Sequence, residues 1–294
     1  EAVVGANLQA GRGGALTMHF TVLDPEFWDL VRLKNVESIP EKRIKDIDYS
    51  VGYNREFARR VAANEEWMLV SYGDAPALHS AMYSDNIHNF RLLYDLVKNN
   101  PEIKKTFVKA RDIAIAFLTE AYETGRFFEH ATDEMNRHTP FLDRIWLSNL
   151  CQEIGLPTSG YDDSDGMFAM QKLYSDYEDV EGEIGLCSLG AIAQGLEEDD
   201  EDYEKTAYYT VLMIDNVIDI MEYPFPHLEV TAKARRSIGV GITNLAYDMA
   251  KRGLRYDTLE GKRHIAKVAE RHSYRSEEHT SELQSHHDLV CRLL

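Results

Sequence analysis

Short segments in which apolar and polar residues alternate, separated by segments that begin like helices, constrain the fold of this chain most strongly. Residues 16–22 and 47–53 alternate with the two-residue period of a half-buried strand, and residues 67–71 form a third candidate strand. Between the first two, Asp24-Pro25-Glu26 supplies a capping residue, a proline at the first helical position and an early acid, which predicts a helix to about Lys34. Strands separated by helices predict an α/β fold with a largely parallel sheet.

Further elements are expected along the rest of the chain. They are a helix from about Arg55, helical structure over 74–123 ended by Gly125, a short strand over 126–130, a helix after the acidic run 197–202 to about Met221, and a helix ending near Gly253. Residues 158–181 are rich in Asp, Ser, Gly and Tyr and are expected to form a polar loop with one helical turn near Met167–Leu173. Their carboxylates lack the spacing of a calcium loop, so a solvated loop is expected rather than a metal site.

Charge and cysteine content exclude several classes of protein. The 294 residues carry a formal net charge of -18, so binding of nucleic acid through a basic face is not expected. No apolar run is long enough to span a membrane, and the N-terminus does not resemble a signal peptide. The three cysteines lack the regular spacing of a disulfide framework, which makes the cytoplasm the expected compartment. The chain begins with Glu1 rather than Met, so we expect an internal fragment.

One cysteine stands between an amide and a carboxylate in residues 148–158. In extended backbone, Asn149, Cys151 and Glu153 would share one face, and Leu150, Gln152 and Ile154 would occupy the other. A thiol beside a hydrogen-bonding amide and a general base is a compact reaction centre. The alternative is an edge strand with one buried cysteine, because a free cysteine often serves only as a small apolar residue.

The sequence Ser148-Asn149-Leu150-Cys151-Gln152-Glu153-Ile154 resembles the finger-loop motif of the ribonucleotide reductase large subunit, specifically of class I. Three other segments resemble family elements in the same order. They are the glycine-rich loop with Arg12, the segment 183–190 with Cys187, and the Arg235-Arg236 element with Gly239 and Gly241. The resemblance covers roughly residues 5 to 274, and Cys187 lies 36 positions after Cys151, somewhat more than the family pattern.

The resemblance implies a role for each site residue. Cys151 would become a thiyl radical and abstract the 3′ hydrogen of a ribonucleotide, Glu153 would accept the 3′ hydroxyl proton, and Asn149 would hold the sugar hydroxyls. Cys187 would supply one of the two reducing equivalents and become part of a disulfide. Substrate contacts would come from the loop residues Asn149, Leu150, Cys151, Gln152 and Glu153, and from Arg12 in the glycine-rich loop.

The resemblance also implies a fold and partners. The family fold is a ten-stranded α/β barrel with a central finger loop, and residues 1–274 would hold the end of its first half, the loop and the start of its second half. The barrel would therefore be open. Expected partners are a metal-containing small subunit that generates the radical, a second large subunit, and thioredoxin or glutaredoxin as reductant. Nucleoside triphosphates would act as effectors, and the chain itself would bind no metal or cofactor directly.

Several family elements are not found in these residues, among them the second reducing cysteine, the phosphate-binding loop and the paired tyrosines that pass the radical. We therefore expect the chain alone to be inactive. One alternative is the cobalamin-dependent class of reductase, although its finger motif usually reads Asn-Pro-Cys-Gly-Glu, which differs at Leu150 and Gln152. A second alternative is a noncatalytic nucleotide-binding or scaffold protein that keeps the barrel.

Three further features have simpler explanations. His130 and His138 are interpreted as hydrogen-bonded loop or core histidines rather than catalytic groups. Gly239 and Gly241 imitate a dinucleotide fingerprint only loosely, because the third glycine and the following strand with its acid are missing.

The last twenty residues differ from the rest. Residues 275–294 show no continuation of the preceding helical pattern and resemble the translation of a short-read sequencing adapter. The natural sequence would then end near Tyr274, and Cys291 and the tail histidines would carry no biological information. The alternative is a genuine polar tail that binds a metal through His279, His286 and His287.

Overall fold

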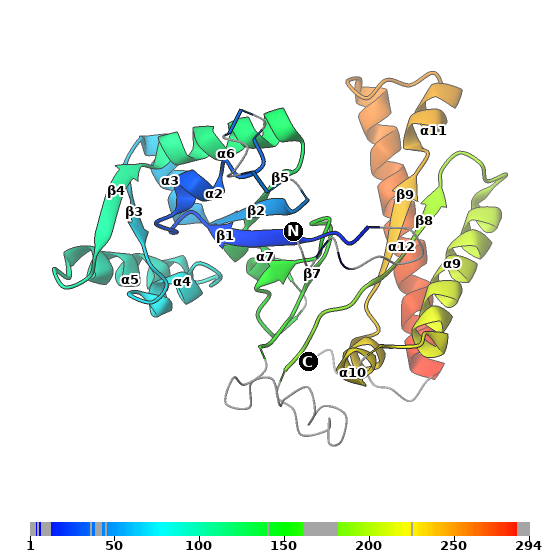
Figure 1. Cartoon of the computed structure of the whole chain (residues 1–294). Coiled ribbons are helices and arrows are strands. Elements are labelled where there is room, and N and C mark those ends of the chain that lie inside the picture. Colours follow the sequence, from blue (N-terminus) through cyan, green and yellow to red (C-terminus); the bar gives the residue numbers. More distant parts are fainter. Residues whose placement is uncertain are drawn as a thin grey trace. The chain divides into compact units, whose positions relative to one another are not determined.

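The computed structural model describes Val4, Ala6 and residues 13–35, 37–38, 43–44, 46–139, 141–160, 182–224 and 226–286. Arg12, Cys291 and the helical turn expected near Met167–Leu173 lie outside the described residues. The chain divides into two compact units, residues 1–157 and residues 158–294, each with its own strands and helices (Figure 1).

A parallel sheet of three strands forms the centre of the first unit. It consists of β1 (Thr17–Thr21), β2 (Asp48–Tyr53) and β5 (Phe127–Ala131) in the order β1-β2-β5 (Figure 1). All three strands were predicted from the sequence, as was a largely parallel sheet, although the predicted strand at 67–71 is not part of it. The α/β assignment is therefore confirmed for this unit.

The two faces of this sheet differ in polarity because successive side chains of a strand point to opposite sides. Tyr49, Val51 and Phe127 share one face and are buried in the main apolar core. The opposite face carries Thr17, His19 and Thr21 from β1, Ser50 and Gly52 from β2, and His130 from β5. The unit thus has a polar sheet face in addition to its apolar core.

A second, antiparallel sheet packs into the same core. It pairs β3 (Glu66–Val70) with β4 (Lys105–Lys109), and the Trp67 indole N–H donates to the Val22 carbonyl over 2.8 Å. The prediction that residues 74–123 are continuously helical is wrong at β4. Thr106, Phe107 and Val108 are β-branched or aromatic residues that favour strands, and pairing with β3 satisfies their backbone groups.

Six helices in the described part of the first unit connect and cover these strands. They are α2 (Phe27–Leu30), α3 (Arg55–Ala63), α4 (Pro76–Ala81), α5 (Ile87–Asn99), α6 (Ala110–Thr124) and α7 (Thr132–Arg137). Asn54 caps α3 by accepting the Phe57 N–H over 3.0 Å, and Gly125 ends α6 in the left-handed conformation, as predicted. Helix α2 is shorter than the predicted helix to Lys34, since residues 31–34 continue as turns.

The second unit is built around two parallel strands, β8 (Ser188–Ala193) and β9 (Ile238–Thr243). Helices α9 (Asp200–Ile220), α10 (Pro226–Arg235), α11 (Leu245–Lys251) and α12 (Leu259–His286) accompany them (Figure 1). The predicted helix after the acidic run is confirmed as α9, which Asp199 caps. The sequence analysis did not identify β8, β9 or α10, because Gly190, Gly239 and Gly241 weaken the strand signal.

The expectation for the C-terminal tail is corrected in one respect. Helix α12 continues without interruption from Leu259 to His286, so residues 275–286 do extend the helical pattern. Glutamate, leucine and glutamine in this stretch are good helix formers. The origin of the tail as an adapter translation stays a prediction.

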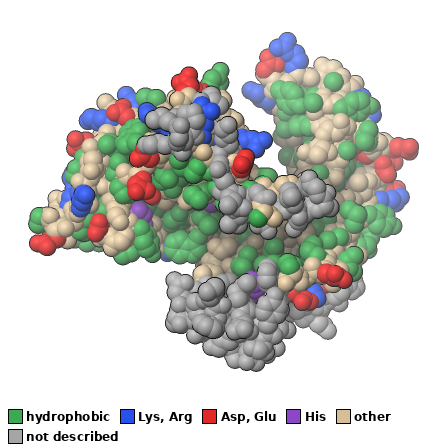
Figure 2. All heavy atoms as spheres, in the orientation of Figure 1, with side chains coloured by type: hydrophobic (Ala, Val, Ile, Leu, Met, Phe, Trp, Pro, Cys, Tyr) green, Lys and Arg blue, Asp and Glu red, His purple; other side chains and the backbone are tan. Residues whose placement is uncertain are grey.

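The described strands form separate sheets of three, two, two and two strands, so they do not close a barrel. This arrangement is consistent with the partial barrel that was expected. Apolar side chains reach the surface of both units (Figure 2). In the part of the chain that the structure describes, no helix combines the length and apolar content required to cross a bilayer.

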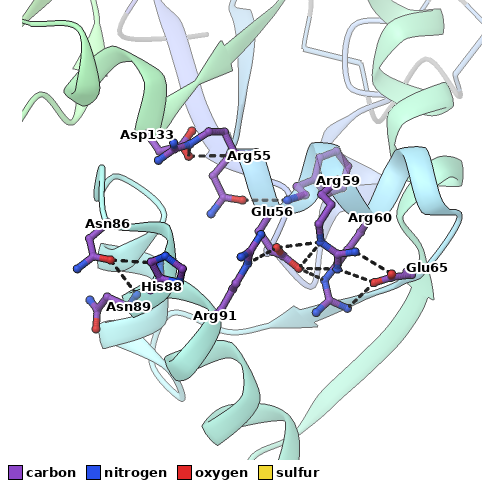
Figure 3. A network of polar contacts seen from close by, with 12 residues as sticks. Arg55, Glu56, Arg59, Arg60, Glu65, Asn86, His88, Asn89, Arg91 and Asp133 are labelled. Atoms are coloured by element: carbon purple, nitrogen blue, oxygen red, sulfur yellow. Dashed lines mark hydrogen bonds and ion pairs between the residues drawn. The ribbon is translucent and has the colours of Figure 1, made fainter.

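A buried carboxylate, Glu56, ties α3 to α5 through arginines (Figure 3). Only 2% of its side chain is exposed, and it accepts hydrogen bonds from Arg59, Arg60 and Arg91 at 2.6 to 3.2 Å. Burial alone would raise the pKa of Glu56, but the hydrogen bonds from Arg59 and Arg91 outweigh it and hold the pKa below its ordinary value. Glu65 joins the same network from an exposed position.

We predict that Glu56→Gln lowers the free energy of unfolding of the first unit by about 2 kcal/mol, because three guanidinium groups lose their shared charge partner. Urea unfolding followed by tryptophan fluorescence measures this, since Trp28, Trp67 and Trp146 all lie in the first unit. The matched control, Glu65→Gln, should cost much less, because that carboxylate is solvated. Equal losses in the two variants would contradict the structural importance of the buried carboxylate.

Candidate active site

The predicted reaction centre lies at the turn of a short hairpin. Strands β6 (Leu147–Ser148) and β7 (Gly155–Leu156) pair antiparallel, and residues 149–154 connect them. The Asn149 N–H donates to the Ile154 carbonyl over 3.1 Å, and the Ser148 hydroxyl donates to the same carbonyl over 2.7 Å. These bonds close the base of the turn.

The expectation of extended backbone through the cysteine is wrong. The Gln152 N–H donates to the Asn149 carbonyl over 3.2 Å, which closes a tight turn around Leu150 and Cys151. Gln152 has a φ of 68°, in the left-handed region that non-glycine residues rarely adopt. This conformation costs about 1 kcal/mol or more, so other contacts of the loop must compensate for it.

The turn leaves its reactive side chains accessible. Cys151 and Glu153 are both exposed, two residues apart near the apex of the turn. Neither side chain forms a hydrogen bond or an ion pair with another described residue. A thiol and a carboxylate are therefore both available to a molecule bound over the hairpin.

The amide of Asn149 is oriented by the loop itself. Its Oδ1 accepts the Ile154 N–H over 3.0 Å, so the oxygen faces the backbone of the turn. The Nδ2 group, which only donates, makes no hydrogen bond to another described residue. A donor in this position could bind a sugar hydroxyl or stabilise negative charge developing on an oxygen.

The polar face of the central sheet holds the residues on either side of Cys151. The Thr17 hydroxyl on β1 donates to the Leu150 carbonyl over 2.7 Å. The Ser50 hydroxyl on β2 donates to the Gln152 Oε1 over 3.1 Å, and the Gln152 Nε2 donates to the Asn149 carbonyl over 3.0 Å. Both ends of the Gln152 amide are thus engaged within the protein, so the substrate contact expected for Gln152 stays a prediction.

The entry to the hairpin is fixed from α7. Asn136 donates through Nδ2 to the Ile145 carbonyl and accepts the Ile145 N–H through Oδ1, both over 2.8 Å. Gly155 begins the return strand where a Cβ would lie 2.5 Å from the Met135 sulfur. Glycine therefore lets this strand approach α7 closely.

Two histidines on the polar sheet face approach one another. His19 and His130 have ring centroids 6.3 Å apart in an edge-to-face arrangement. His130 is 6% exposed, so of the two expected positions it takes the core one, but its Nε2 is buried with no hydrogen-bond partner among the described residues, which corrects the expectation that it is hydrogen-bonded. His138, in contrast, is exposed and bonds Glu134 over 2.9 Å.

Burial, together with the smaller effect of the nearby His19, lowers the pKa of His130 to about 4. Burial also lowers the pKa of His19. Both rings are therefore neutral near pH 7.

Cys187 belongs to the second unit, directly before β8, and is partly buried. Its sulfur lies 3.9 Å from the Ser188 carbonyl oxygen. Four residues earlier, Glu183 accepts two hydrogen bonds from Arg235 over 2.6 and 2.8 Å, and Arg236 binds Asp215 of α9 over 2.8 Å. Arg235 at the end of α10 thus holds Glu183, and Arg236, just before β9, holds α9.

The remaining site predictions concern ligands. Arg12 lies outside the described residues, so its proposed substrate contact stays a prediction. Among the described residues no group of three or more histidine, cysteine, aspartate or glutamate side chains is placed to hold a metal ion.

Sequence reasoning missed Thr17 and Ser50 as parts of the site. Both hydroxyls are buried, with 8% and 0% of the residue exposed, yet they come from segments read only as half-buried strands. The one available signal was their position on the polar face of those strands.

Comparison with known proteins places this chain in a family. The family model described as "Ribonucleotide reductase, barrel domain" matches residues 1–291. The subunit alpha of ribonucleoside-diphosphate reductase from Buchnera aphidicola (Acyrthosiphon pisum) is 34% identical over 248 residues, which are 83% of this chain and 31% of that protein.

The corresponding subunit from Haemophilus influenzae is also 34% identical, over 83% of this chain and 31% of its own length. The subunit from Enterobacteria phage T4 is 32% identical, over 84% of this chain and 31% of its own length. The chain therefore belongs to the ribonucleotide reductase barrel-domain family, and it spans about a third of the length of these curated relatives.

We predict that the first unit loses about 2 kcal/mol of stability between pH 7 and pH 5 because of His130. Its pKa is about 4 when folded, against about 6.5 when unfolded, so the unfolded state binds the proton first as the pH falls. The loss begins below about pH 6.5 and levels off below about pH 4. His130→Gln should remove it, whereas the control His88→Gln, at an exposed site, should keep it.

Urea unfolding at the two pH values, followed by tryptophan fluorescence, measures the difference. An unchanged pH dependence in His130→Gln would contradict the burial of a neutral imidazole at this position.

Proposed function

We propose that this chain carries the reaction centre of a class I ribonucleotide reductase large subunit, which reduces ribonucleoside diphosphates to 2′-deoxyribonucleotides. The observation that carries the proposal is the hairpin turn, where an exposed thiol, an exposed carboxylate and an amide N–H donor lie within five residues. Family membership supports it, and the curated relatives are named for ribonucleoside diphosphates. The enzymatic activity would belong to a protein longer than these 294 residues.

Cys151 would act first. A partner subunit would oxidise its thiol to a thiyl radical, which then removes the hydrogen atom from the 3′ carbon of the ribose. The exposed position of the thiol supports this role, because the sulfur must approach the sugar directly.

Glu153 and Asn149 would act on the sugar hydroxyls. Glu153 would accept the proton of the 3′ hydroxyl as the 2′ hydroxyl leaves as water. The Asn149 Nδ2 donor would stabilise the carbonyl oxygen that forms at the 3′ position, since the amide oxygen is already bound to Ile154.

Cys187 would complete the reduction with a second cysteine. Two thiols supply two electrons and two protons, form one disulfide, and leave a deoxyribonucleotide and water as products. In the last step the Cys151 thiol would return its hydrogen atom to the 3′ carbon of the reduced sugar, which restores the thiyl radical.

The partners follow from this chemistry. We propose a metal-containing small subunit as radical source, a second large subunit, a thioredoxin or glutaredoxin that reduces the disulfide, and nucleoside triphosphates as effectors. The cytoplasm is the proposed compartment, because the reaction requires cysteines that stay reduced between turnovers.

We predict that Cys151→Ala in the complete subunit lowers deoxynucleotide formation at least about 1,000-fold, because no other group on the loop can carry the radical. Binding of the ribonucleotide, measured by calorimetry, should persist within about threefold, since the thiol acts on the transition state rather than on binding. Cys151→Ser serves as a control for side-chain size and should be equally inactive. Turnover above a tenth of the unsubstituted rate would overturn the proposed function.

A further inference from the structure

Cys151 is held in place by its two chain neighbours rather than by its own contacts. Its side chain is exposed, as are those of Leu150 and Glu153, so apolar packing does not fix this part of the loop. A loop without packing keeps one geometry only if hydrogen bonds define it. The hydrogen bonds from the sheet therefore fix the geometry of the loop.

Two bonds come from different strands. Thr17 of β1 reaches the backbone carbonyl of Leu150, and Ser50 of β2 reaches the side chain of Gln152. Because β1 and β2 pair in parallel within one sheet, their hydroxyls are rigidly spaced. The backbone of Cys151 is thus fixed from both sides by one rigid surface.

Gln152 adds a third bond. Its Nε2 donates to the Asn149 carbonyl, so one side chain links the sheet to the residue that carries the proposed catalytic amide. The backbone of Gln152 is in the left-handed conformation, with a φ of 68°. The direction of the chain immediately after the thiol therefore depends on this side chain staying bound.

We propose that Thr17, Ser50 and Gln152 are positioning residues that direct the Cys151 thiol at the sugar carbon from which hydrogen is removed. The inference rests on the proposed function and adds residues that it does not use. Ser50 is fully buried, and Gln152 provides the hydrogen-bond acceptor for its hydroxyl. Removing either partner frees the loop on that side.

The chemistry explains why positioning matters. Hydrogen transfer between carbon and sulfur requires the reacting atoms at about 3–3.5 Å with correct alignment, and a displacement of about 1 Å can cost about 100-fold in rate. Substrate binding depends on many contacts and is much less sensitive. A positioning defect should therefore lower kcat and leave KM nearly unchanged.

The test uses the complete large subunit with its radical-generating partner. Thr17→Val, Ser50→Ala and Gln152→Leu each remove one side of the hydrogen-bond set. Turnover is expressed per ribonucleotide-binding site, which removes any effect of a smaller folded fraction, and is measured with substrate carrying hydrogen or deuterium at the 3′ carbon. The expected result is a kcat reduced at least about tenfold, a KM within about twofold, and a larger deuterium isotope effect.

Thr21→Val is the matched control. Thr21 is a buried hydroxyl on the same sheet face, but its Oγ1 accepts the Leu23 N–H and does not touch the loop. This variant should keep kcat per binding site and the isotope effect. The double variant Ser50→Ala with Gln152→Leu should lose no more than Gln152→Leu alone, because that substitution already removes the bond to Ser50.

Gln152→Leu lies in the exposed turn and tests the inference even if a strand variant fails to fold. Unchanged kcat per site and unchanged isotope effect in the folded variants would overturn the inference, as would an equal loss in Thr21→Val. These outcomes differ from a failure of the proposed function, which would appear as turnover in Cys151→Ala.

Discussion

The parallel pairing of β1, β2 and β5 is the constraint on which the rest of the first unit depends. Val51 and Phe127 fill the core from one face, so the opposite face receives the polar residues of the same strands. A slip of one residue would exchange the two faces and bury polar groups in the core. The register that satisfies the core therefore also places Thr17 and Ser50 where the hairpin with Cys151 meets the sheet.

A thiol that is proposed to react with a substrate must be accessible, and its position must also be fixed. In the hairpin, different groups meet these two requirements. Hydrogen bonds at its base and on its sheet side fix the backbone, while the apex of the turn leaves Cys151 and Glu153 exposed. The left-handed backbone conformation of Gln152 helps the chain to reverse its direction within the turn. Substitutions that stabilise the loop by burying its apex would therefore oppose its proposed chemistry.

The sequence predicted the elements whose pattern is local. It failed for the elements and contacts that depend on residues far apart in the chain. Residues 47–53 were recognised because alternation alone defines a strand, but residues 105–109 were assigned to a helix because only pairing with β3 makes them a strand. The candidate site was proposed from the residues around Cys151, but the hydrogen bonds that anchor this loop were not predicted. Thr17 and Ser50 lie 133 and 102 positions from their partners in the loop, so no local pattern could reveal these bonds.

The most direct measurement of the central claim is a structure of the complete large subunit with a bound ribonucleoside diphosphate. The account predicts the Cys151 sulfur at about 3.5 Å from the 3′ carbon of the ribose, as hydrogen transfer requires. Asn149 and Glu153 should lie within hydrogen-bond reach of the sugar hydroxyls. A ribose bound away from the hairpin, with its 3′ carbon beyond reach of the thiol, would contradict the account.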